Sequence, residues 1–171
     1  MTPTGGATRP PWAQDGADMD LAELEKVVVA AKTATYVGGG VTAPASRTGS
    51  HDLGWRDGRW SYLDSYVGGT DFHGQEVVWL DDEPVWAMSY YGAVLRPDLV
   101  DGERAGLTIK AALSAMYIEG RFLGGYEHVG EHGTYVDAST GGVGRFHGRE
   151  VILVDGVEAY ALDYFGGLVV P

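Results

Sequence analysis

The chain has 171 residues, with 24 acidic and 12 basic side chains, so its formal net charge is −12 at pH 7. Such a charge repels nucleic acid and anionic membrane surfaces, which argues against both as direct partners. No cysteine is present, which excludes disulfides, thiol nucleophiles and thiolate metal sites. No signal-peptide pattern and no apolar run of transmembrane length was found, and these observations together favour a cytoplasmic protein.

The first part of the chain predicts a tail, a helix and a loop. Residues 1–18 are rich in proline, glycine and alanine, which is typical of a flexible tail. A helix is expected from Asp20, because an acidic residue at Glu23, three positions later, is typical of a capping box. Gly38 to Gly40 should end this helix. The stretch 41–57 is interpreted as a loop because it contains Pro44 and many small polar residues.

Three strands are expected next, over 60–67, 77–80 and 85–95, and their short turns predict an antiparallel meander. A linker over 96–105 then precedes a second helix, over 107–119. Trp86, Met88 and Tyr90 alternate with other residues in the third strand, so we expect these three side chains on the buried face.

The stretch from residue 72 to residue 95 recurs near the C-terminus. It has the sequence FHGQEVVWLDDEPVWAMSYYGAVL, and residues 146–169, FHGREVILVDGVEAYALDYFGGLV, align with it without a gap. Such repetition predicts one structural unit that occurs twice. We therefore expect an α+β fold, a single domain over 19–171 made of two repeats, 19–96 and 106–171. Each repeat would be one helix plus a three-stranded antiparallel meander, and a pseudo-two-fold axis would relate them.

Three motifs of the first repeat carry a resemblance. They are Tyr-x-Asp-x-Tyr-x-Gly-Gly from Tyr62, Phe-x-Gly-x-Glu from Phe72 and Pro-Val-Trp-x-Met-x-Tyr-x-Gly from Pro84. With them, the chain from about residue 20 onward resembles an uncharacterised bacterial domain family. That family is a domain of unknown function, often found C-terminal to XRE-type helix-turn-helix modules. The resemblance implies a stand-alone version of a regulator-associated domain, and it implies neither a reaction nor a ligand.

Acidic residues at matching places in the two repeats are the first candidates for chemistry. Glu76 and Glu150 each follow a Phe-His-Gly, and Asp64 and Asp137 recur as well. Two carboxylates related by symmetry can act as an acid and a base. The other interpretation is that each glutamate satisfies backbone donors or an arginine within its own repeat.

The loop from Ser46 to Trp55 has no counterpart in the second repeat, and loops often carry function. Arg47 could hold an anionic group, and His51 could act as a base near neutral pH. Arg47 and Asp52 would then lie at the rim of a cleft. The alternative is that Arg47 pairs with a nearby carboxylate and only orders the loop.

A second polar cluster comprises Glu127, His128, Glu131 and His132. Two histidines four residues apart can bind zinc when they share one face of a helix. Gly130, within this cluster, favours a loop instead. We therefore predict no metal site, and nothing in the sequence indicates a cofactor.

Three functions remain compatible with these patterns. The first is a small-molecule-binding or sensor-type domain, with a cationic or aromatic ligand in a cleft between the two repeats. The expected ligand contacts are Arg47, Asp52, Glu76, Trp86, Tyr90, Glu150 and Tyr164. The alternative is a cofactor-independent isomerase, cyclase or hydrolase acting on a small metabolite in the same cleft, with His51, Glu76 or Glu150 as the catalytic candidate. A third is a partner-binding protein without a pocket. The sequence leaves open whether a reaction is catalysed and whether the chain forms a homodimer.

Overall fold

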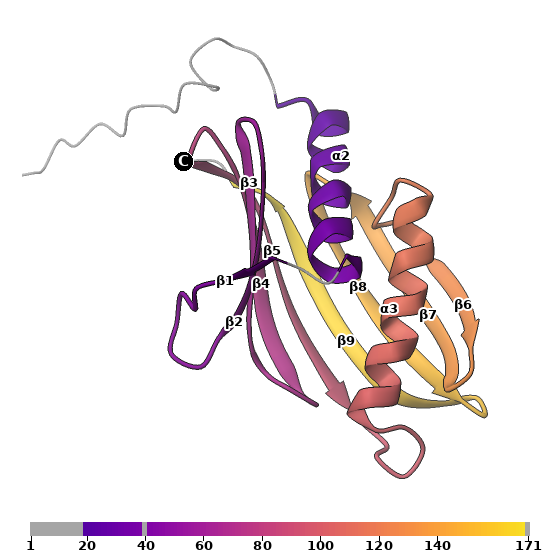
Figure 1. Ribbon diagram of the computed structural model, residues 1–171. Coiled ribbons are helices and arrows are strands. Elements are labelled where there is room, and N and C mark those ends of the chain that lie inside the picture. The colour runs from indigo at the N-terminus through magenta and orange to yellow at the C-terminus, as the bar shows by residue number, and fades with distance from the viewer. Residues whose placement is uncertain (1–18, 39–40, 170–171) are drawn as a thin grey trace, which may run out of the picture.

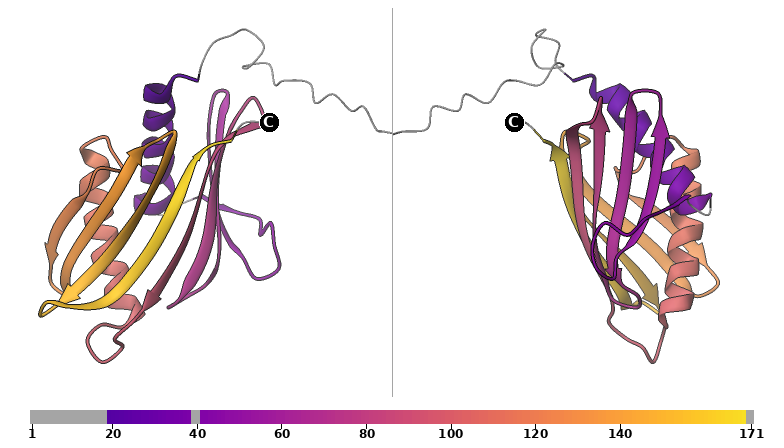
Figure 2. Two further views of the ribbon diagram at one scale, coloured as in Figure 1. Left: turned by 180° about the vertical axis from the view of Figure 1, so that it is seen from behind. Right: turned by 60° about the vertical axis from the view of Figure 1, so that its left-hand side comes forward.

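The structure is a computed structural model that describes residues 19–38 and 41–169. The predicted tail over 1–18 lies outside these residues. Within them, nine strands form one antiparallel sheet, and two α-helices lie against one face of it (Figure 1). The sheet is strongly curved, and the helices lie in its hollow, whereas Figure 2 shows that the opposite face carries no helix. None of these helices is long and apolar enough to cross a membrane.

The sheet has the strand order β1-β2-β3-β4-β5-β9-β8-β7-β6. The first five strands are β1 (Val41–Ala43), β2 (His51–Asp57), β3 (Trp60–Gly68), β4 (Phe72–Leu80) and β5 (Glu83–Val94). The remaining four are β6 (Tyr126–Gly130), β7 (Gly133–Gly142), β8 (Arg145–Val154) and β9 (Val157–Leu168). Because β5 pairs with β9, the first and second halves of the chain meet in the middle of one continuous sheet.

Helix α2 (Leu21–Lys32) begins where the sequence predicts it. The Asp20 carboxylate accepts hydrogen bonds from the backbone N–H groups of Ala22 and Glu23, which satisfies donors that a helix start leaves free. The helix continues into the π-helical turn η1 (Thr33–Val37). Helix α3 (Gly102–Ile118) is capped in the same way, by the side chain of Asp101.

The predicted fold class is wrong. The chain does not fold as two units of one helix plus a three-stranded meander, because a single nine-stranded sheet dominates the structure. The stretch 41–57, interpreted as a loop, contributes β1 and β2, and the segment after α3, for which no strand was predicted, contributes β6. All three of these strands lie at or near the sheet edges, where hydrogen bonding to a neighbouring strand outweighs weak local strand propensity.

The alternation of side chains predicted for β5 agrees with the structure. Trp86 is fully buried, and Met88 and Tyr90 are nearly so, on the face that the helices cover. On the opposite face, Tyr91 is 53% exposed, and Phe165 on the neighbouring strand β9 is 63% exposed. The hydrophobic core therefore lies between the sheet and the two helices.

Candidate functional site

A cavity of about 330 Å³ lies between the sheet and the helices. Most of its wall is aromatic or aliphatic, and both halves of the chain contribute, with Tyr90 on β5 and Tyr164 on β9 near its middle. The lining also includes Gly69, exposed in the turn after β3, and the half-exposed Gly106 of α3. The cavity therefore reaches the surface between this turn and the first turns of α3.

Four carboxyl side chains line the cavity in two neighbouring pairs. Asp64 on β3 is opposite Glu76 on β4, and Asp137 on β7 is opposite Glu150 on β8. Side chains directly opposite one another on adjacent strands are close neighbours on one face of a sheet. Each pair therefore places two acidic groups side by side on the cavity wall.

Each aspartate accepts a short hydrogen bond from a tyrosine two strands away. The hydroxyl of Tyr90 donates to Oδ1 of Asp64 and that of Tyr164 donates to Oδ1 of Asp137, both over 2.6 Å. The two rings cross the intervening strands at Gly74 and Gly148, where a Cβ atom would lie only 2.2 Å from the nearest atom of the tyrosine side chain. The glycine of each Phe-His-Gly motif therefore makes room for the tyrosine above it.

A buried cation, Lys32, lies beside one of these acids. The Nζ of Lys32, at the end of α2, donates to Oε1 of Glu76 over 2.6 Å, and both side chains are almost completely buried. The same ammonium lies 5.6 Å from the centre of the Phe122 ring, within the range of a cation–π contact.

Several polar atoms of the cavity have no hydrogen-bond partner, although they are buried. They are Oε2 of Glu76, Oδ2 of Asp137, Oε2 of Glu150 and the hydroxyls of Tyr135 and Tyr160. A buried polar group without a partner is costly, so such groups are uncommon and call for a specific explanation. Their concentration in one cavity distinguishes this site from the rest of the core.

Burial changes the acidity of these carboxyls. Burial and the charge of Glu76 raise the pKa of Asp64 to about 7. Burial, followed by the charge of Asp137, raises the pKa of Glu150 to about 8. The pKa of Asp137 is also raised, again mainly by burial. Near neutral pH the cavity can therefore either hold or release protons.

The structure places four of the predicted contacts on the cavity wall, namely Glu76, Tyr90, Glu150 and Tyr164. Trp86 lies outside the lining, where it is fully buried and its Nε1 donates to the backbone oxygen of Val143. This indole therefore connects the middle of the sheet to the turn that joins β7 and β8.

Arg47 and Asp52 lie together on the other face of the sheet. Both bind Ser65, which points away from the cavity because its neighbours on β3, Asp64 and Tyr66, line it. Burial opposes ionisation of Asp52, but hydrogen bonds from nearby serines outweigh it and lower the pKa to about 2. This arrangement orders the loop, as the second interpretation of Arg47 expected, although through a serine and not an ion pair.

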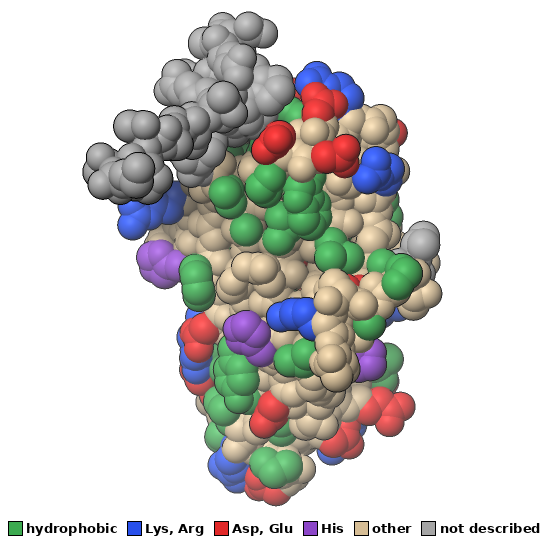
Figure 3. Space-filling view, turned by 90° about the vertical axis from the view of Figure 1, so that its left-hand side faces the viewer, with side chains coloured by type: hydrophobic (Ala, Val, Ile, Leu, Met, Phe, Trp, Pro, Cys, Tyr) green, Lys and Arg blue, Asp and Glu red, His purple; other side chains and the backbone are tan. Residues whose placement is uncertain are grey.

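His51 is exposed, and its ring centre lies 5.1 Å from that of Tyr66, a residue of the cavity wall. It is therefore the one loop candidate close to the cavity. Figure 3 shows the left-hand side of the molecule as drawn in Figure 1, where histidines lie near both basic and hydrophobic side chains.

The expected ligand contacts did not include Asp64, Asp137 or Lys32, although all three line the cavity. Asp64 and Asp137 recur between the repeats, and this recurrence could have marked them as site residues. Their hydrogen bonds with the tyrosines could not be predicted, because each tyrosine reaches its aspartate across an intervening strand. Lys32 follows Leu24 and Val28 at intervals of four on the buried side of α2. A lysine on the apolar face of a helix could have indicated a buried partner.

The residues of the suspected zinc cluster lie on a hairpin. Glu127 and His128 are on β6, and Glu131 and His132 form the turn before β7. Among residues 19–38 and 41–169, no group of three or more potential ligands is arranged to hold a metal ion.

The fold and the cavity define a protein with one antiparallel sheet and a carboxyl-rich cavity between that sheet and two helices. Residues 64–169 match the model of a domain of unknown function, DUF5680. This match spans more than half of the chain, so the chain belongs to that family, and the predicted resemblance to a family of unknown function is confirmed at this level. Comparison with curated proteins and with solved structures gave no match.

Proposed function

We propose that this domain binds a small molecule in the cavity between the sheet and the helices. The observation that carries the proposal is a set of buried polar atoms without partners on the wall of an otherwise apolar cavity. A ligand that supplies those partners would remove the cost of leaving them unpaired. Ligand sites are commonly apolar cavities with a few convergent polar groups, and often lie between structural halves.

The size of the cavity limits the ligand. About 330 Å³ is at the lower end of the range for small-molecule sites, which suits a compact molecule of one or two rings. The tyrosine and phenylalanine rings of the wall favour a flat, apolar body. The resemblance to a domain that often accompanies helix-turn-helix modules supports a sensor role, in which occupancy of the cavity would be the signal.

A glycine of α3 allows the proposal to be tested. Gly106 lines the cavity, and a Cβ atom placed there would meet nothing within 4 Å. In Gly106→Phe the ring should fill the mouth of the cavity, whereas Gly106→Ala leaves it open and should stabilise the helix by about 1 kcal/mol. Thermal-shift screening against a metabolite panel should give ligands that raise the melting temperature of the wild type and of Gly106→Ala, but not of Gly106→Phe. A panel without any stabilising compound, or hits that also stabilise Gly106→Phe, would contradict binding in this cavity.

The second candidate is a cofactor-independent isomerase, cyclase or hydrolase. It is favoured by the raised pKa of Asp64, about 7, and that of Glu150, about 8, because general acids and bases work best near the ambient pH. His51, at the edge of the cavity, is a further proton carrier. Turnover of a bound compound, followed by NMR, should be lost in Asp64→Asn and Glu150→Gln if this candidate is correct. Ligands that are recovered unchanged would favour simple binding.

A further inference from the structure

The two carboxyl pairs of the cavity differ in how they are neutralised. Glu76, in the pair on β3 and β4, forms an ion pair with Lys32. For the pair on β7 and β8, Asp137 and Glu150, no lysine, arginine or histidine within the described part of the chain lies at ion-pairing distance. The cavity therefore has one acidic pair with a cation and one without.

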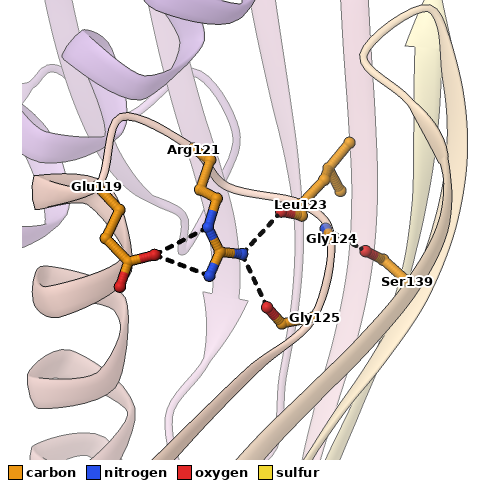
Figure 4. Close-up of polar contacts among 6 residues, drawn as sticks. All are labelled: Glu119, Arg121, Leu123, Gly124, Gly125 and Ser139. Atoms are coloured by element: carbon orange, nitrogen blue, oxygen red, sulfur yellow. Dashed lines mark hydrogen bonds and ion pairs between the residues drawn. The ribbon is translucent and has the colours of Figure 1, made fainter.

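Arg121 is a basic side chain close enough to Asp137 to lower its pKa, but it is committed elsewhere. Its guanidinium donates to the Glu119 carboxylate and to the backbone oxygens of Leu123 and Gly125, as Figure 4 shows. These contacts hold the turn that connects α3 to β6. Arg121 therefore has a structural task in this turn and forms no ion pair with Asp137.

The pair without a cation, Asp137 and Glu150, also contains buried acceptor atoms that a ligand could bind. Oδ1 of Asp137 accepts from Tyr164, which leaves Oδ2 without a partner although the residue is only 5% exposed. Oε2 of Glu150 and the hydroxyl of Tyr135 are also buried, and neither atom forms a hydrogen bond of normal geometry. The two groups are close neighbours, since the Tyr135 hydroxyl partly offsets the rise that burial causes in the pKa of Glu150, and Tyr135 has no exposed surface. Tyr135 and Asp137 lie on the same side of β7, and Glu150 is opposite Asp137 on β8.

We infer that Asp137, Glu150 and Tyr135 form the subsite for the primary ammonium group of an amine ligand, whose apolar body lies along the aromatic wall. This inference rests on the proposed function. A primary ammonium has three donors in a compact group, and the subsite offers three unpartnered oxygens. The ligand's ammonium group would form an ion pair with Glu150, as Lys32 does with Glu76. An anionic ligand would instead meet two further carboxyls.

Amine binding should be linked to proton release. Glu150 is affected by Asp137 and Tyr135 on β7, by Lys32 on α2 and by Glu76 on β4, and only Lys32 among these carries a positive charge. A neighbouring ammonium favours the ionised carboxylate, so a carboxyl that is protonated in the empty cavity loses its proton when the amine binds. Affinity should therefore rise between pH 6 and pH 8, while the amine itself remains charged.

Titration calorimetry with three compounds of matched size tests the inference. The probes are 2-phenylethylamine, the neutral 2-phenylethanol and the anionic 3-phenylpropanoate, each titrated into the wild type, Glu150→Gln and Glu158→Gln. Glu158 is an exposed carboxylate on β9 whose partner is Arg149, so its replacement makes the same change of side chain away from the cavity. We expect the amine to bind at least tenfold more tightly than the other two probes, and Glu150→Gln to lose at least tenfold in amine affinity. Glu158→Gln should bind like the wild type, and buffers of different ionisation enthalpy should show proton release.

Two results would overturn the inference while leaving the proposed function in place. One is equal or tighter binding of the alcohol or the acid, and the other is unchanged amine affinity in Glu150→Gln. If arylalkylamines from benzylamine to 4-phenylbutylamine do not bind, the hits of the thermal-shift metabolite panel decide whether the amine subsite exists. Panel hits without a basic nitrogen would then refute the amine subsite alone, whereas a panel with no hit would refute the proposed function as well. An amine hit from the panel that depends on Glu150 would support the subsite.

Discussion

Gly74 and Gly148 determine how the tyrosines of the cavity reach the carboxyls. Tyr90 must pass over β4, and Tyr164 over β8, before each hydroxyl meets its aspartate. Only a residue without a side chain leaves the ring in contact with the backbone beneath it. The absence of a Cβ atom at these glycines therefore allows the two tyrosine–aspartate hydrogen bonds of the cavity to form.

We expect Gly74→Ala and Gly148→Ala each to lower the free energy of unfolding by roughly 1–3 kcal/mol, because the added methyl group overpacks the site. The closest atom of the tyrosine side chain would lie 2.2 Å from the new Cβ in both variants. Gly142→Ala, where a Cβ meets nothing within 4 Å, is the matched control and should change stability little. Urea denaturation measures the three values. Equal stability of all three variants would show that the rings do not depend on these glycines.

At the scale of secondary-structure elements, the ion pair of Lys32 and Glu76 joins helix α2 to the middle of the sheet. Both charges are buried, so each depends on the other for its stability more than a surface pair does. The π-helical turn η1 follows Lys32 directly, and Tyr36 within it also lines the cavity. Movement of α2 would therefore change the cavity wall.

Replacement of Lys32 by methionine should destabilise the protein by roughly 3–5 kcal/mol at neutral pH, because Glu76 would remain buried without its cation. The double variant Lys32→Met, Glu76→Leu should recover much of that loss, since two apolar side chains of similar volume replace the pair. Chemical denaturation of the wild type, both single variants and the double variant gives the coupling energy. Additive effects of the two substitutions would mean that the ion pair contributes no coupling.

At the scale of the whole molecule, the acidic cavity controls how stability depends on pH. Asp64 and Glu150 have pKa values of about 7 and about 8, against usual values of 3.8 and 4.5. Between the usual and the raised pKa of each group, the folded state therefore holds more protons than the unfolded state. Its stability falls as the pH rises through this range. Asp52 acts in the opposite direction, because its pKa is lowered to about 2, so its contribution is lost only as the pH falls below about 4.

We expect the empty protein to be most stable near pH 4 and to lose roughly 2 kcal/mol or more by pH 8, since each pKa unit corresponds to about 1.4 kcal/mol. Glu150→Gln should flatten this decline, because the variant no longer has that carboxyl to ionise. Thermal or urea unfolding over the pH range measures both curves. A wild-type stability that rises from pH 5 to pH 8 would contradict the raised pKa values of the cavity carboxyls.

Some features of the protein follow from short stretches of sequence. The cap at Asp20, the alternating burial of Trp86, Met88 and Tyr90, and the recurring glutamates were all readable, because helix caps and strand alternation depend on neighbouring residues. Strands β1, β2 and β6 could not be predicted from the sequence, because pairing with neighbouring strands, and not their own residues, holds them in place. The prediction of a three-stranded repeat unit was wrong for the same reason.

The sequence by itself determined that the chain carries matching acidic and aromatic residues in its two halves, since the identity and spacing of residues are properties of the chain. Only the tertiary structure decided what these residues do. The pairing of β5 with β9 brings the two halves into one sheet, and the helices enclose four carboxyls with a single lysine. That imbalance of charge arises from contacts between segments far apart in sequence, such as Lys32 with Glu76 and Tyr164 with Asp137. Local patterns carry no information on such contacts, because burial and Coulomb interactions depend on distances in space.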